Sequence, residues 1–89
     1  MTDTAKVEIY TTSSCPYCHA AKSLLDEKGV DYTETDVANP DLRQAMIARA
    51  NGRRTVPQIF VGDTHVGGYD DMAALDRSGG LDPLLTGQR

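Results

Sequence analysis

The sequence predicts a small α/β domain with helices on both faces of one mixed sheet. Segments with strand-like alternation and segments with helical spacing follow in the order strand, helix, strand, helix, hairpin, helix. The first strand–helix–strand unit requires a parallel crossover, whereas the hairpin is antiparallel, so the sheet is mixed. A chain of 89 residues has room for one domain. We therefore expect a single domain over residues 1–89, with loose ends at 1–5 and 86–89.

The first half of the chain predicts a strand, a helix and a second strand. Residues 7–10 alternate apolar and polar side chains and run into a polar loop. Residues 16–28 form the helix, because Pro16 suits its first position, apolar residues recur at helical spacing and Gly29 provides a stop. Residues 32–36 have the composition of a second, short strand.

A second helix is predicted between Asn39, which can cap its first turn, and the pair Asn51–Gly52, which ends it. Its apolar residues Leu42, Ala45, Met46 and Ala50 are expected to share one face of the helix.

The last part of the chain predicts a hairpin and a third helix. Residues 58–61 and 64–66 are strand-like and are separated by the turn residues Gly62–Asp63. Gly67–Gly68 ends the second of these strands, and Asp70 or Asp71 can cap the helix that follows. Gly79–Gly80 closes that helix, and we expect residues 81–85 to form only a short turn.

Composition excludes several functional classes. The net charge is −4 and the isoelectric point is near 4.9, which argues against nucleic acid as a partner, because phosphate binding needs clustered Lys and Arg. No apolar run approaches the roughly 18 residues of a membrane span. Residues 1–6 lack the apolar stretch of a signal peptide. We expect a monomeric protein of the cytoplasm.

The two cysteines, Cys15 and Cys18, are the strongest chemical signal in the chain. A structural disulfide is a poor explanation, because a loop this short hardly restrains the unfolded chain. A zinc site would need four ligands, and only His19 and His65 could complete it, so we expect no metal. A C-x-x-C pair beside a strand–helix–strand unit is instead typical of a redox dithiol.

The position of Cys15 before the helix suggests its role. Unpaired backbone N–H groups and the helix dipole favour a thiolate there, so Cys15 is the expected nucleophile. Cys18 lies one turn inward and is the expected resolving thiol. A stabilised thiolate is also a good leaving group, so a mixed disulfide on Cys15 is readily displaced by the next thiol.

Three separated motifs together resemble the dithiol glutaredoxins, most of all their short bacterial type. These are CPYC at 15–18, TVPQIF at 55–60 and GGYDD at 67–71. The similarity runs from about Lys6 to Leu85. It implies a thioredoxin-like fold with a four-stranded sheet, and glutathione as co-substrate with no bound cofactor.

The resemblance also implies roles for individual residues. Cys15 would carry the glutathione mixed disulfide, and Cys18 would resolve protein disulfides through a redox-active Cys15–Cys18 bond. The glutathione-binding residues would be Tyr17, Arg53, Thr55, Val56, Pro57, Gly68, Tyr69 and Asp70.

Within that set, some roles are more specific. Val56 would pair its backbone with the glutathione cysteine, beside a cis Pro57. Backbone N–H groups of Tyr69 and Asp70 would hold the γ-glutamyl carboxylate, and the Asp70 side chain would face the ammonium group. Arg53 would clamp the glycyl carboxylate. Asp70 as a plain helix cap is an equally good interpretation when this residue is taken alone.

Two positions depart from the family pattern. Thr12 stands where relatives usually have a lysine, and Tyr69 where close relatives often have another cysteine. The first departure bears on how strongly the Cys15 thiolate and glutathione are stabilised. We hypothesise that Arg54 supplies part of the missing charge.

The predicted function is a glutathione-dependent thiol–disulfide oxidoreductase that acts on glutathionylated proteins through Cys15, and on protein disulfides through both thiols. Ribonucleotide reductase is one candidate substrate. Two alternatives stay open. In the first, two chains share an iron–sulfur cluster through Cys15 and glutathione. In the second, the dithiol is an electron donor reduced by thioredoxin reductase.

Overall fold

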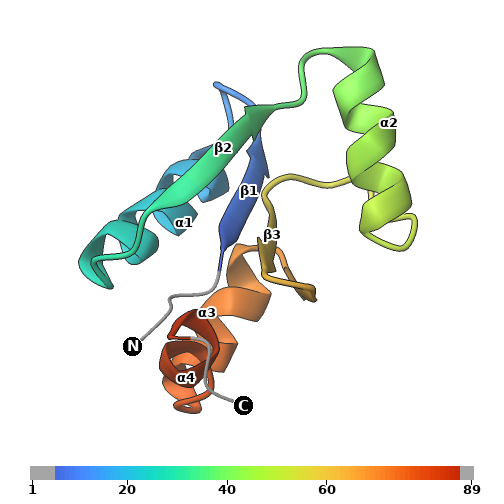
Figure 1. Ribbon diagram of the computed structural model, residues 1–89. Helices are drawn as coiled ribbons and strands as arrows, with labels where there is room; N and C mark the ends of the chain where they lie inside the picture. Colours follow the sequence, from blue (N-terminus) through green and yellow to red (C-terminus); the bar gives the residue numbers. More distant parts are fainter. Residues whose placement is uncertain (1–5, 87–89) are drawn as a thin grey trace.

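One four-stranded sheet, with strand order β2-β1-β3-β4, forms the centre of the molecule (Figure 1). The computed structural model describes residues 6–86. The strands are β1 (Val7–Thr11), β2 (Tyr32–Asp36), β3 (Gln58–Val61) and β4 (Thr64–Gly67). β1 pairs in parallel with β2 and antiparallel with β3, which pairs antiparallel with β4. The predicted mixed sheet is confirmed. Its first and last strands are each one residue longer than expected, and the last one includes Gly67, which was expected to end it.

In the described part of the chain, four helices surround this sheet. They are α1 (Pro16–Glu27), α2 (Pro40–Arg49), α3 (Tyr69–Arg77) and α4 (Leu81–Leu85). α1, α3 and α4 lie together, whereas α2 stands apart on the other side of the strands (Figure 1). Residues 81–85 were expected to form a turn and instead form α4. Buried Leu81 and Leu85 anchor that helix to the core, which a plain turn could not do.

The main core lies between the sheet and the helices α1, α3 and α4. Side chains from one face of β1 and β3 meet side chains from the three helices. The buried members are Val7, Ile9, Ala21, Leu25, Ile59, Val61, Met72, Leu81 and Leu85. Because alternate strand residues point to opposite faces, Glu8, Tyr10 and Phe60 lie on the face away from this core.

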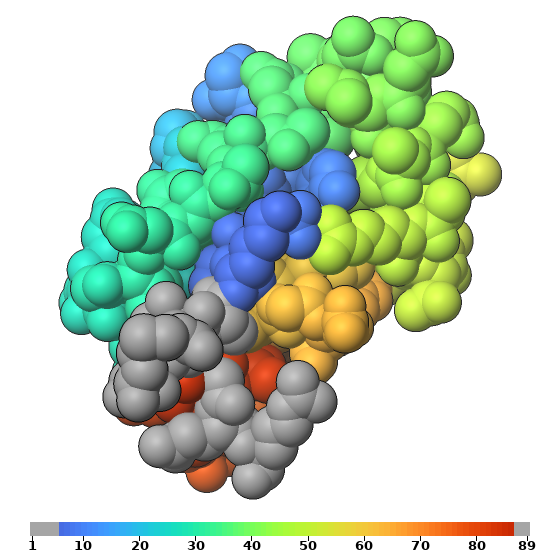
Figure 2. All heavy atoms as spheres, in the orientation of Figure 1, coloured from blue at the N-terminus to red at the C-terminus, as the bar shows by residue number. Residues whose placement is uncertain are grey.

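Arg49, at the end of α2, joins that helix to the second face of the sheet. Its guanidinium pairs with Glu8 at 2.7 Å, donates to the Tyr10 hydroxyl at 3.2 Å and lies 4.1 Å from the centroid of the Phe60 ring. Such a cation over an aromatic face is attracted by the ring. In Figure 2 the atoms of α2 form a ridge on one side of the molecule, with β1 between them and β2.

The predicted apolar face of α2 is buried over only part of its length. Met46 and Ala50 are buried, but Leu42 and Ala45 are exposed. The reason is that α2 meets the sheet through its C-terminal half, so the apolar residues of its first turns have no surface to cover. Its predicted ends are confirmed: the Asn39 side chain caps the start, and Asn51 ends the helix with a φ of 58°.

The two expected loose ends fall almost entirely on residues 1–5 and 87–89, which lie outside the described residues. Thr86 is described, and its hydroxyl donates to the carbonyl oxygens of Asp82 and Pro83, so this residue closes α4. Over residues 6–86, no helix is long and apolar enough to cross a membrane.

Candidate functional site

Cys15 occupies the N-cap position of α1, as predicted. Pro16 follows it at the first helical position, so the helix starts directly at the cysteine. The Cys15 sulfur accepts a hydrogen bond from the backbone N–H of Cys18 at 3.2 Å, and its thiol lies 3.6 Å from the carbonyl oxygen of Val56. A thiolate at this atom therefore has an N–H donor and the positive end of the helix dipole beside it.

The two thiols differ in access to solvent. Both are free, but Cys15 is half-buried and Cys18 is completely buried. Burial, followed by the hydrogen bond with Cys15, raises the pKa of Cys18 to about 12. Cys18 therefore stays protonated at neutral pH in the reduced protein, and Cys15 is the thiol that a substrate can reach.

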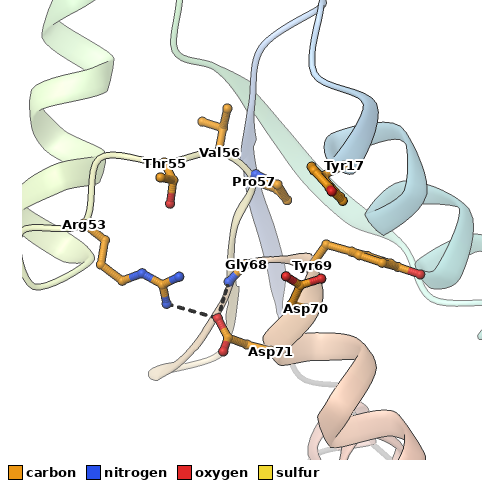
Figure 3. A pocket seen from close by; sticks show the side chains of 9 residues that line it. All are labelled: Tyr17, Arg53, Thr55, Val56, Pro57, Gly68, Tyr69, Asp70 and Asp71. Carbon is orange, nitrogen blue, oxygen red and sulfur yellow. Dashed lines mark hydrogen bonds and ion pairs between the residues drawn. The ribbon is translucent and has the colours of Figure 1, made fainter.

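The loop before β3 runs next to Cys15. Its Val56–Pro57 peptide bond is cis, as expected. The Val56 carbonyl oxygen points at the Cys15 thiol, while the Val56 side chain points away from the neighbouring pocket residues (Figure 3). Val56 thus presents its main chain to the site.

The start of α3 forms the opposite side of the site. Its N-cap is Gly68, so the predicted cap at Asp70 or Asp71 is wrong. Asp71 instead reaches back from the third helical position, and its Oδ2 accepts from the Gly68 N–H at 2.9 Å. Because the first intrahelical bond is donated by Met72, the N–H groups of Tyr69 and Asp70 precede the helical ladder and are available to an anion.

These elements enclose a pocket of about 340 Å³ (Figure 3). Its lining consists of Tyr17, Arg53, Thr55, Val56, Pro57, Gly68, Tyr69, Asp70 and Asp71. All eight residues expected to bind glutathione line it, from three segments that are distant in sequence. Cys15 is not part of this lining, but its thiol lies 3.6 Å from the carbonyl oxygen of the lining residue Val56.

Asp71 is the lining residue that the sequence interpretation missed as a site residue. Besides the Gly68 bond, its Oδ2 pairs with Nη1 of Arg53 at 3.1 Å. The Gly68 N–H first, and then Arg53, hold the pKa of Asp71 below its usual range, so it is ionised at neutral pH. The only signal in the sequence was its place in the first turn of a helix, which also suits a plain capping role.

Arg54 takes a different position from Arg53. It is exposed, it is not part of the pocket lining, and its carbonyl oxygen accepts from Arg43 at 2.9 Å. Of these two adjacent arginines, the structure brings Arg53 to the pocket.

Tyr17 and Tyr69 form one wall of the pocket. Their rings stack with centroids 6.4 Å apart, and Tyr17 is 61% exposed. His19 is exposed, and His65 bonds to buried Gln58 at 2.7 Å outside the lining. Gln58 in turn donates to the Thr55 carbonyl and hydroxyl, so its amide supports the pocket wall from behind.

Comparisons with known proteins agree with this geometry. The family model for glutaredoxin matches residues 7–66. Glutaredoxin 3 of Escherichia coli is 57% identical over 82 residues, covering 91% of this chain and 98% of that protein. A probable glutaredoxin of Synechocystis is 54% identical over 86 residues, covering 96% of this chain and 98% of the relative.

Solved structures give the same result. The solution structure of glutaredoxin from Brucella melitensis has a TM-score of 0.82 at 51% identity, covering 93% of this chain and 90% of that one. A crystal structure of a buckwheat glutaredoxin–glutathione complex has a TM-score of 0.83 at 32% identity, covering 93% and 78%. The predicted thioredoxin-like fold is confirmed, and the chain belongs to the glutaredoxin family.

Proposed function

We propose that this glutaredoxin reduces protein–glutathione mixed disulfides through Cys15 alone, and protein disulfides through Cys15 and Cys18 together. The observation that carries the proposal is the accessible Cys15 sulfur at a helix N-terminus, beside a pocket of peptide size. Family membership supports a glutathione-dependent thiol oxidoreductase. The buckwheat relative in complex with glutathione supports the choice of co-substrate.

In the route that needs one thiol, the Cys15 thiolate attacks the glutathione sulfur of the mixed disulfide. The substrate protein leaves as a thiolate and takes a proton from solvent, and Cys15 now carries glutathione. A second glutathione thiolate attacks the sulfur of the bound glutathione. Oxidised glutathione is released and Cys15 leaves as a thiolate. The Cys18 N–H, which donates to this sulfur, favours that leaving group.

In the route that needs two thiols, Cys15 attacks a disulfide of the substrate protein and forms a mixed disulfide with it. In forming that mixed disulfide the other substrate sulfur leaves as a thiolate, which can take up the Cys18 proton. Cys18 then attacks the Cys15 sulfur, which releases the second substrate sulfur as a thiolate that is protonated by solvent. Two glutathione molecules reduce the resulting Cys15–Cys18 disulfide and leave as oxidised glutathione. Burial of Cys18 supports this order, because its sulfur can be reached from Cys15 but not from bulk solvent.

Glutathione carries two carboxylates and one ammonium group, and the charges of the pocket complement them. The N–H groups of Tyr69 and Asp70 suit the γ-glutamyl carboxylate, and the Asp70 side chain suits the ammonium group. Arg53 suits the glycyl carboxylate. The Val56 main chain suits the cysteine backbone in the manner of an added strand.

The walls of the pocket complete the proposed binding site. Among the lining residues, Tyr17 and Pro57 provide apolar surface, and Thr55 and Gly68 provide polar surface. The support for these assignments is that every one of these residues lines the same pocket.

Glutathionylated or disulfide-bonded proteins of the cytoplasm are the proposed substrates, with ribonucleotide reductase as one candidate. The use of both cysteines in one redox pair supports a reducing compartment. A monomer is proposed because, among residues 6–86, the only large apolar side chains that are exposed are Tyr17 and Leu42.

The test is turnover of a small glutathione mixed disulfide in the presence of glutathione, glutathione reductase and NADPH. We expect steady NADPH consumption that is lost in Cys15→Ser. Activity that depends on thioredoxin reductase and not on glutathione would contradict the proposal.

A further inference from the structure

Asp71 joins the two sides of the pocket through a single oxygen. Its Oδ2 accepts from the Gly68 N–H at the start of α3 and from Nη1 of Arg53 in the loop after α2 (Figure 3). The side chains of Arg53 and Asp71 are 45% and 48% exposed, and an ion pair this exposed contributes little to stability. The value of the pair must therefore lie in where it holds the guanidinium.

An arginine that is free in solvent samples many rotamers and loses that freedom when it binds a ligand. Asp71 engages one terminal nitrogen of Arg53, and within residues 6–86 the other N–H groups of this guanidinium make no hydrogen bond. The other terminal nitrogen, Nη2, lies near Gly68: a Cβ placed there would be 3.7 Å from it. The planar fork is thus held at the mouth of the pocket with donors left for an incoming carboxylate.

The backbone at Gly67 leaves room for the Arg53–Asp71 ion pair. Gly67 has a φ of +112°, and a Cβ at this position would collide with Oδ2 of Asp71 and lie 2.8 Å from Nη1 of Arg53. The ion pair therefore occupies the space that a side chain at position 67 would fill. A surface pair formed by chance has no such space reserved for it.

We propose that Asp71 is a positioning residue that fixes the Arg53 guanidinium for the glycyl carboxylate of glutathione. The inference rests on the proposed function and extends it to a residue that does not itself touch the ligand carboxylate. Asp71 carries a negative charge, so by charge alone it would repel glutathione. The proposal states that its orienting effect on Arg53 outweighs this repulsion.

The experiment compares two substrates, the mixed disulfide of glutathione and the same compound with the glycyl carboxylate blocked as an ethyl ester. With the first substrate, Asp71→Ala should raise KM about 3- to 10-fold, the scale of one net hydrogen bond, and change kcat less than twofold. With the ester, the same variant should change KM less than twofold. Arg53→Ala should behave in the same way, and the double variant should resemble Arg53→Ala alone.

Two further variants control for fold and net charge. Asp71→Asn keeps an oxygen that can accept from Gly68, so it protects the start of α3 while removing the charge, and it should raise KM in the same direction if Asp71→Ala does not fold. Asp31→Ala removes an exposed carboxylate directly before β2, outside the pocket lining, and should leave both KM values unchanged.

The outcomes separate this inference from the proposed function. An unchanged or lowered KM for glutathione in both Asp71 variants, with a raised KM in Arg53→Ala, would overturn the positioning role only. An equal rise for the acid and the ester would show a merely structural role and would also overturn it. If the unaltered protein fails to turn over the glutathione substrate at all, the proposed function itself is wrong.

Discussion

The Cys15 thiol lies 3.6 Å from the carbonyl oxygen of Val56, although 41 positions separate the two residues in the chain. The contact places the nucleophile against the residue that precedes the cis peptide bond. A disulfide on Cys15 therefore lies beside the main chain of Val56, for which we propose strand-like pairing with glutathione.

The two proposed routes make different demands on the second thiol. Cys18→Ser should retain at least half of the activity on a glutathione mixed disulfide, because that route needs only Cys15. It should lose most of the activity on a protein disulfide, because the mixed disulfide with the substrate is no longer resolved. Insulin reduction and the small-substrate assay measure the two activities, with Cys15→Ser as the inactive control. Equal loss of both activities would show that the assigned roles are wrong.

The difference in burial predicts selective alkylation. At pH 7 the reduced native protein should incorporate one equivalent of iodoacetamide, at Cys15. Cys18 should stay unmodified, because it is completely buried and its pKa is raised to about 12. Intact-mass measurement with peptide mapping checks this, and the protein unfolded in guanidinium should take up two equivalents. Modification of both thiols at equal rates in the native protein would contradict the assigned environment of Cys18.

The Glu8–Arg49 pair predicts an acid-dependent part of the stability. The hydrogen bond from Arg49 lowers the pKa of Glu8 in the folded protein. Its stabilising contribution is therefore present above the unfolded-state pKa of about 4.3 and is lost as the pH falls through the folded value. Glu8→Gln should lower the free energy of unfolding at pH 7 by up to about 1 kcal/mol, the upper end of the range for a partly exposed ion pair.

Urea unfolding at pH 7 and pH 3 measures this effect. The unaltered protein should lose more stability between the two values than Glu8→Gln does. Glu27→Gln, which changes an exposed residue at the end of α1, is the matched control and should follow the unaltered protein. An identical pH dependence in all three proteins would show that the pair contributes nothing.

Gly67 and Gly62 offer a matched test of the space beneath the ion pair. Both have a positive φ, of 112° and 58°, so alanine should cost about 1 to 2 kcal/mol of stability at either position from backbone strain. Only at Gly67 would the new Cβ collide with Asp71 and Arg53; at Gly62 there is nothing within 4 Å. Gly67→Ala should therefore also raise KM for the glutathione substrate, whereas Gly62→Ala should leave KM unchanged. A raised KM in both variants would indicate a general effect of instability.

The elements that could be predicted from the sequence are those with local signals. Pro16 and Gly29 mark the limits of α1, and the turn at Gly62 is correct, because turn and cap chemistry depends on residues close in the chain. Leu42 shares the apolar face of α2 but is exposed. Its burial depends on how far α2 extends past the sheet, and helical spacing in the sequence does not give that distance.

In the candidate site, too, residues within short sequence motifs could be predicted, whereas a residue whose role depends on a distant partner could not. The pocket brings together the three motifs that suggested the family, including Tyr17, Pro57 and Asp70. Asp71 was missed because its importance arises from Arg53, 18 positions earlier, which only folding brings within 3.1 Å. The hypothesis that Arg54 supplies charge to the site stays a prediction. Of the two adjacent arginines only Arg53 lines the pocket, and sequence position alone does not distinguish them.

The sparse attachment of α2 has a dynamic consequence. Met46 and the C-cap Ala50 are the completely buried residues of this helix, and Arg49 pairs with Glu8 on the sheet. We therefore expect α2 to separate from the sheet more readily than α1, α3 and α4 do. Its amide protons should then exchange with deuterium through local opening, long before the central strands do. Arg53 donates its backbone N–H to Ala50, the C-cap of α2, at 3.2 Å, so the loop that carries the guanidinium is hydrogen-bonded to the end of this helix. Local opening of α2 should therefore also expose the Arg53 amide proton to exchange.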